Sequence, residues 1–71
     1  MYIDKTVKLP KMPQILERDV RELTEYYDDG DETAFLLLEE TVCSAVKQAV
    51  IDNQITREEG LRIFDYFGWG R

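Results

Sequence analysis

Apolar residues recur at helical spacing in three successive segments of the chain. The first stripe, at i, i+4, i+7 and i+11, consists of Leu16, Val20, Leu23 and Tyr27. Ile15 and Tyr26 lie beside it. Pro13 suits the first helical position, where a missing N–H costs nothing, and Gly30 is the expected left-handed stop. The pattern predicts a helix between these two residues.

A second helix is predicted over about residues 32–51. Its apolar residues cover an arc of roughly 200° on a helical wheel: Phe35, Leu36, Leu38, Val42, Cys43, Ala45, Val46, Ala49 and Val50. An arc that wide predicts neighbours on two sides. Glu39 falls inside the arc, and Leu37 falls outside it on the polar face.

The third predicted helix follows the capping box Thr56-Arg57-Glu58-Glu59 and extends to Phe67. Its apolar face consists of Leu61, Ile63, Phe64 and Phe67. Gly60 shares this face, where it costs about 1 kcal/mol relative to alanine. We therefore expect a close approach of the backbone to its neighbour at Gly60.

Residues 1–12 precede the helices and are predicted to be an extended arm. Ile3, Val7 and Leu9 lie on one side of it, and Pro10 and Pro13 keep its end out of helical geometry. The arm either lies across the helices or is a lone strand that pairs only in a dimer. The predicted fold is all-α: a three-helix bundle over residues 13–67 with an extended N-terminal arm, followed by a flexible tail over residues 68–71.

Composition limits how so small a domain can be stabilised. With 71 residues, one cysteine and no histidine, the chain forms no intrachain disulfide and lacks the commonest zinc ligand. Self-association is the remaining route. The N-terminus has no signal-peptide apolar region, and no apolar run approaches the roughly 20 residues of a membrane span. We expect a cytoplasmic protein without membrane contact.

The sequence offers few residues suited to catalysis or metal binding. Histidine, the commonest general acid or base, is absent, and Cys43 lies mid-helix among apolar residues, which is typical of a buried structural thiol. The acidic turn Asp28–Glu32 resembles a calcium loop, but its ligand spacing fails. We expect no enzymatic activity, no cofactor and no metal.

Charge is the strongest functional signal. Residues 17–32 carry eight acidic side chains against Arg18 and Arg21, a local net charge of −6. One interpretation is a solvated face that keeps the domain soluble. The other is a docking surface for a basic partner protein, with this chain acting as a phosphate mimic. The candidate partner-binding carboxylates are Glu22, Glu25, Asp28, Asp29, Asp31 and Glu32.

Exposed aromatic and apolar residues extend the candidate surface. Tyr66 falls off the apolar face of its helix, Trp69 follows the helix end, and Leu37 lies on a polar face. We assign these three to an interface, where aromatic anchors are enriched. Trp69 has the alternative role of a lid folded back over the core.

Two other functions compete with docking. A structural homodimer would bury the arm and the aromatic edge between subunits. A helix-turn-helix DNA reader would use the second and third helices, but its reading helix would present Glu58, Glu59 and Asp65 to phosphates. We therefore do not expect nucleic acid as a partner.

The segments Leu9–Pro13, Tyr26–Asp31 and Ile55–Gly68 together resemble those of small uncharacterised helical proteins from phages and integrative mobile elements of Gram-positive bacteria. The resemblance covers most of the chain and consists of caps and turns. It brings no catalytic or binding residues. It implies an accessory protein that acts by contact.

Overall fold

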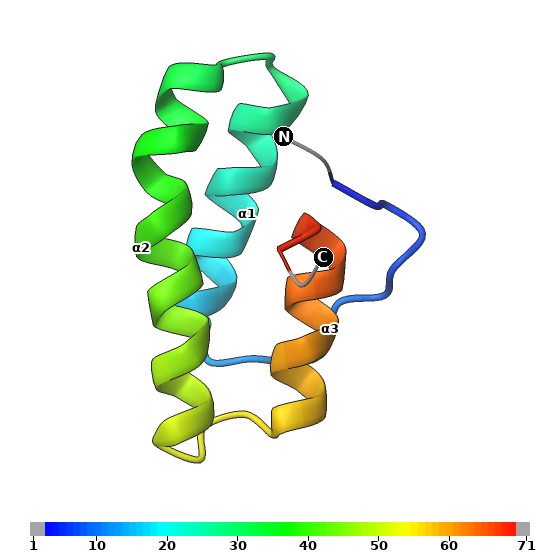
Figure 1. The fold of residues 1–71 in the computed structure, drawn as a ribbon, viewed down its shortest axis with the longest axis vertical. Coiled ribbons are helices and arrows are strands. Elements are labelled where there is room, and N and C mark those ends of the chain that lie inside the picture. The colour runs from blue at the N-terminus through cyan, green and yellow to red at the C-terminus, as the bar shows by residue number, and fades with distance from the viewer. Residues whose placement is uncertain (1–2, 70–71) are drawn as a thin grey trace.

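A computed structural model describes residues 3–69 of the protein. It contains three helices, α1 (Gln14–Asp28), α2 (Glu32–Ile51) and α3 (Arg57–Phe67). Helices α1 and α2 form an antiparallel pair, and the shorter α3 lies beside them (Figure 1). Residues 3–69 contain no strand. The predicted all-α three-helix bundle is confirmed.

Local sequence signals set the ends of the helices. Pro13 is the N-cap of α1, so that the helix begins one residue later than predicted, at Gln14. Gly30 follows α1 with φ +72°. Asp31 caps α2 by accepting a hydrogen bond from the backbone N–H of Ala34, at 3.1 Å. The capping box of Thr56 and Glu59 at the start of α3 is present as predicted.

Helix α2 is the centre of the bundle. It packs against both α1 and α3, which make no close backbone contact with each other within the described residues. This confirms the two neighbours that the wide apolar arc predicts. One hydrophobic core joins the three helices, the α2–α3 turn and the arm. Its buried residues are Ile3, Leu16, Val20, Leu23, Phe35, Val42, Val46, Ala49, Ile55, Ile63, Tyr66 and Phe67.

The N-terminal arm lies across the helices of its own chain. Ile3 is 6% exposed and belongs to the core. The backbone N–H of Asp4 donates to the carbonyl oxygen of Tyr66 at 2.8 Å, and Nζ of Lys5 contacts both carboxylate oxygens of Asp28 at 2.8 and 2.9 Å. From there the arm passes α3 and crosses to the start of α1 (Figure 1). The arm thereby lies on the side of the bundle where the backbones of α1 and α3 do not come close to each other.

Several predicted core positions are wrong. Leu36 is 61% exposed, Leu61 is 55% exposed, and Cys43 is only half-buried. The difference in helix length explains the exposure of Leu36. The 11 residues of α3 rise about 16 Å, whereas the 20 residues of α2 rise about 30 Å. Because α3 starts from the turn after α2, it covers only the C-terminal part of α2.

The glycine in α3 marks a tight helix contact, as predicted. A methyl group at Gly60 would lie 2.7 Å from Cγ2 of Val50 on α2. Any larger residue therefore has to displace α2 or its side chains. The contact fixes the distance between α2 and α3 at the end of the bundle next to their connecting turn.

Candidate functional site

The six candidate carboxylates gather at one end of the bundle, which we call the acidic end. They lie on the last two turns of α1, in the α1–α2 turn and on the first turn of α2, at the top of Figure 1. Glu22 is half-buried and the others are exposed: Glu25, Asp28, Asp29, Asp31 and Glu32. Residues 22–32 thus bring six carboxylates to one end of the bundle.

Three of these carboxylates already make structural contacts. Asp28 is paired with Lys5, and Asp31 caps α2. Glu22 accepts a hydrogen bond from the hydroxyl of Tyr26, at 3.0 Å. That bond, together with the negative charge of Glu22, raises the pKa of the Tyr26 hydroxyl above its ordinary value. Glu25, Asp29 and Glu32 extend into solvent beside them.

A shallow apolar hollow adjoins the acidic end between α1 and α2. Its volume is about 230 Å³, and its lining residues are Glu22, Tyr26, Ala34, Leu37 and Leu38. Leu37 is 77% exposed, the largest exposure among the large apolar residues described. The structure therefore brings Leu37 together with Glu22, two residues that the sequence assigns to the docking surface.

Tyr66 does not belong to this surface. The prediction that it lies off the apolar face is wrong, because Tyr66 is 6% exposed and its ring packs on Phe67 with centroids 4.9 Å apart. Its hydroxyl lies 3.2 Å from Oγ1 of Thr24 on α1. Helix α3 has a second buried face because α1 and the arm cover it.

Trp69 packs on residues of α3 and α2 outside the acidic end. Its ring stacks on Phe67 at 4.5 Å and meets Phe64 edge-on at 5.6 Å, and its Nε1 donates to Oε2 of Glu39 at 2.9 Å. Trp69 is therefore the lid, the alternative role considered for it. Glu39 lies within the apolar arc of α2 because it accepts this bond. Of the predicted tail, Gly70 and Arg71 lie outside the described residues.

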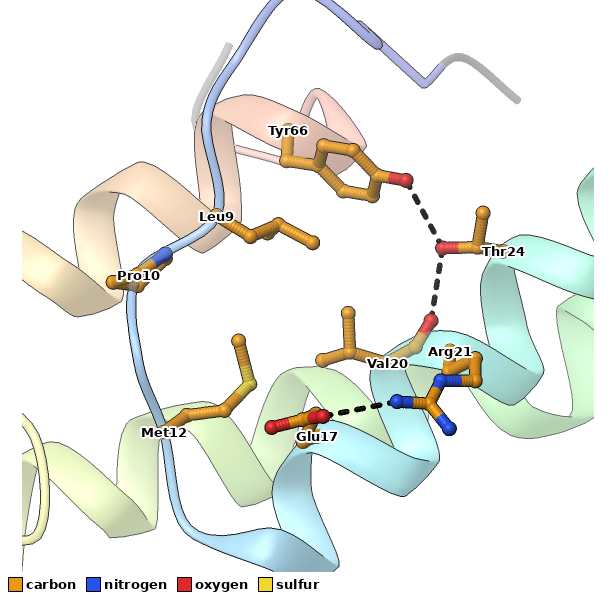
Figure 2. A pocket seen from close by; sticks show the side chains of 8 residues that line it. All are labelled: Leu9, Pro10, Met12, Glu17, Val20, Arg21, Thr24 and Tyr66. Atoms are coloured by element: carbon orange, nitrogen blue, oxygen red, sulfur yellow. Dashed lines mark hydrogen bonds and ion pairs between the residues drawn. The ribbon is translucent and has the colours of Figure 1, made fainter.

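Sequence reasoning misses a second cavity, which we call the arm pocket. It lies between the arm, α1 and α3 and has a volume of about 330 Å³ (Figure 2). Its lining residues are Leu9, Pro10, Met12, Glu17, Val20, Arg21, Thr24 and Tyr66. Three segments that are distant in the sequence contribute to it, so no local sequence pattern predicts it.

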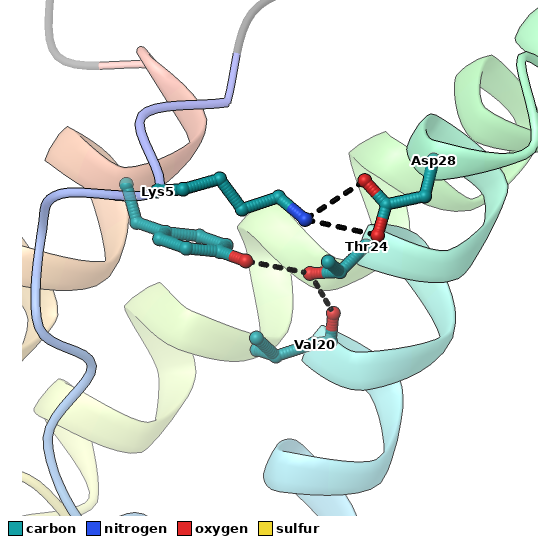
Figure 3. A network of polar contacts seen from close by, with 5 residues as sticks. Lys5, Val20, Thr24 and Asp28 are labelled. Atoms are coloured by element: carbon teal, nitrogen blue, oxygen red, sulfur yellow. Dashed lines mark hydrogen bonds and ion pairs between the residues drawn. The ribbon is translucent and has the colours of Figure 1, made fainter.

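A short chain of hydrogen bonds forms one wall of the arm pocket. Oγ1 of Thr24 donates to the carbonyl oxygen of Val20 at 2.9 Å (Figure 3). The hydroxyl of Tyr66 lies 3.2 Å from the same Oγ1 of Thr24 (Figure 2). At the pocket edge, Nη2 of Arg21 donates to Oε1 of Glu17 at 2.9 Å (Figure 2). The pocket thus combines apolar walls with a small number of oriented polar groups.

The remaining features offer little chemistry. Within residues 3–69, no group of three or more ligand-type side chains is arranged to hold a metal ion. No helix in that range is long and apolar enough to cross a membrane. Cys43 lines a third hollow with Trp69 and Lys47. The two arrangements suited to a function are the acidic end and the arm pocket.

Comparison with protein-family models, with curated proteins and with solved structures finds no match.

Proposed function

We propose that the protein is a non-enzymatic interaction module that docks on a basic surface of a partner protein through its acidic end. The observation that carries this proposal is the position of Leu37. It is a large apolar side chain, 77% exposed, beside a hollow bordered by Glu22 and close to the exposed carboxylates of the α1–α2 turn.

An exposed leucine next to a charged surface matches the composition of protein interfaces. Apolar anchors supply affinity in the centre, and charges around them steer association. A basic amphipathic helix satisfies both parts of the surface, because its apolar face fits the hollow and its lysines or arginines face the carboxylates. Phosphate-bearing partners are disfavoured by the net charge of −6 of residues 17–32.

A homodimer formed through the arm is less favoured, because the apolar residues of the arm already pack on the core of their own chain. Ile3 is buried within a single chain, and Val7 and Leu9 pack against the same core. A dimer that buried these residues between subunits would first have to release them. Docking of a different protein needs no such rearrangement, since the acidic end and Leu37 are already exposed.

The test is binding of a basic amphipathic helical peptide, measured by calorimetry at low and at physiological salt. We expect affinity that falls with rising salt, because exposed charge pairs are screened. Leu37→Ser and the triple substitution Glu25→Gln, Asp29→Asn, Glu32→Gln should each weaken binding at least tenfold. The matched control is Leu61→Ser with Glu58→Gln, which removes an exposed leucine and a carboxylate from α3.

An equal loss of affinity in the control variant would contradict docking at the acidic end. Binding that does not depend on salt would contradict it as well. Sedimentation of the free protein separates the homodimer: a salt-independent dimer at micromolar concentration would favour self-association. Binding of duplex DNA at physiological salt would favour the nucleic-acid alternative instead.

A further inference from the structure

The hydrogen bonds in the arm pocket leave an acceptor without a donor. A threonine hydroxyl has one proton, and that of Thr24 is committed to the carbonyl oxygen of Val20. In its contact with Tyr66, at 3.2 Å, Thr24 therefore accepts and Tyr66 donates. Both hydroxyl protons are thus in use, and within residues 3–69 no hydrogen-bond donor lies on the phenolic oxygen of Tyr66.

The rest of the pocket is suited to an aromatic ring. Leu9, Val20 and the thioether of Met12 surround the open space beside the Tyr66 ring (Figure 2). Thioether sulfur and aromatic rings both make favourable contacts with a further ring. The volume of about 330 Å³ lies within the usual range for small-molecule pockets.

Charge favours a neutral ligand. The charged lining residues, Glu17 and Arg21, neutralise each other at the pocket edge. An anion would have to compete with Glu17 for the guanidinium in a chain of net charge −6. A cation would have to compete with Arg21 for the carboxylate.

We propose that the arm pocket binds a small neutral aromatic molecule with one hydrogen-bond donor, such as a phenol or an indole. The ring lies against Tyr66, Met12 and Val20, and its O–H or N–H donates to the Tyr66 oxygen. A free small molecule fits better than a partner's peptide, because the arm residues beside the pocket include Pro10, which has no N–H to offer a peptide backbone. This site is independent of the acidic end.

The test compares 4-fluorophenol with 4-fluoroanisole, which has the same ring but no donor. Binding is followed by ¹⁹F NMR and by amide shifts of the protein. We expect shifts that cluster at Val20, Thr24 and Tyr66, and about fivefold tighter binding of the phenol, the size of one ordinary hydrogen bond.

Substitutions at the hydroxyl pair make the test specific. Thr24→Val removes the acceptor for the Tyr66 proton, which is then available to the oxygen of either probe, so that the preference for the phenol should shrink. Thr24→Ser keeps the hydroxyl and should keep the preference. Tyr66→Phe should abolish the discrimination in a variant whose fold is checked by circular dichroism, and Leu37→Ser at the acidic end should change nothing.

Three results would overturn the proposal. The first is equal affinity of the wild-type protein for the two probes, and the second is a set of amide shifts centred away from the arm pocket. The third is binding of a capped Gly-Tyr-Gly peptide at least tenfold tighter than 4-fluorophenol. That result would identify the pocket as a receptor for a side chain of another protein.

Discussion

The indole nitrogen of Trp69 donates a hydrogen bond to the carboxylate of Glu39 at 2.9 Å. This contact joins the residue that follows α3 to a residue in the N-terminal half of α2, 30 positions earlier. The indole stacks on Phe67 at the same time. Trp69 therefore covers part of the α2 surface that α3 is too short to reach.

We expect Trp69→Phe to lower the free energy of unfolding by about 1–2 kcal/mol, because it removes a hydrogen bond to a charged, part-buried acceptor and keeps an aromatic ring. Trp69→Ala should cost about 2–4 kcal/mol, since the ring contacts with Phe64 and Phe67 go as well. Urea denaturation measures both values. Leu61→Ala is the exposed control and should stay within about 0.5 kcal/mol of wild type.

Gly60→Ala should destabilise the protein although alanine favours helices. The gain in helix propensity is about 1 kcal/mol, but the new methyl group would lie 2.7 Å from Cγ2 of Val50. Overpacking costs about 1–3 kcal/mol, and valine is rotationally restricted, so we expect a net loss of up to about 2 kcal/mol. Thermal unfolding of Gly60→Ala, of Val50→Ala and of the double variant measures the coupling energy between the two positions. Additive effects in that double-mutant cycle would exclude the clash as the cause.

The arm should contribute to stability through its buried apolar residue rather than through its surface ion pair. Ile3→Ala should lower the free energy of unfolding by about 2–4 kcal/mol, a large share of the total for a small domain. Lys5→Met, which removes the pair with Asp28, should have little effect because both side chains are about half exposed. Denaturant titration of the two variants distinguishes them. A larger effect from Lys5→Met would show that the ion pair, and not Ile3, holds the arm.

The hydrogen bond from Tyr26 to Glu22 predicts a pH dependence at alkaline pH. Because the folded-state pKa of Tyr26 is raised, this bond stabilises the fold below the ordinary tyrosine pKa of about 10. Its contribution is lost as the pH rises through the raised value. The pKa of Lys5 is also raised, first by its hydrogen bond with Asp28, so the arm contact is lost in the same direction.

Titration of the Tyr26 ring carbon by ¹³C NMR measures this shift. Glu22→Gln should move the pKa of Tyr26 back toward its ordinary value, because the negative charge is gone. Glu25→Gln should change the pKa of Tyr26 less, since Glu25 acts only through its charge at a distance and contributes less than Glu22. Titration of Tyr26 at or below the value of free tyrosine would show that the bond is not formed in solution.

The sequence alone determined the helices and their ends. Apolar spacing placed α2 at residues 32–51, and the capping box placed the start of α3, because periodicity and capping act over a few neighbouring residues. The acidic end also followed directly, since its carboxylates all fall within residues 22–32, on either side of one turn. Gly60 was recognised as a contact point from its unfavourable place in a helix.

Only the tertiary structure decided which faces are covered. Tyr66 is buried because the arm and α1 close over α3, and Leu36 is exposed because α3 ends before reaching it. The arm pocket and the contact of Trp69 with Glu39 combine segments tens of residues apart. Relative helix lengths and the path of the arm set these relationships, and neither leaves a periodic signal in the chain.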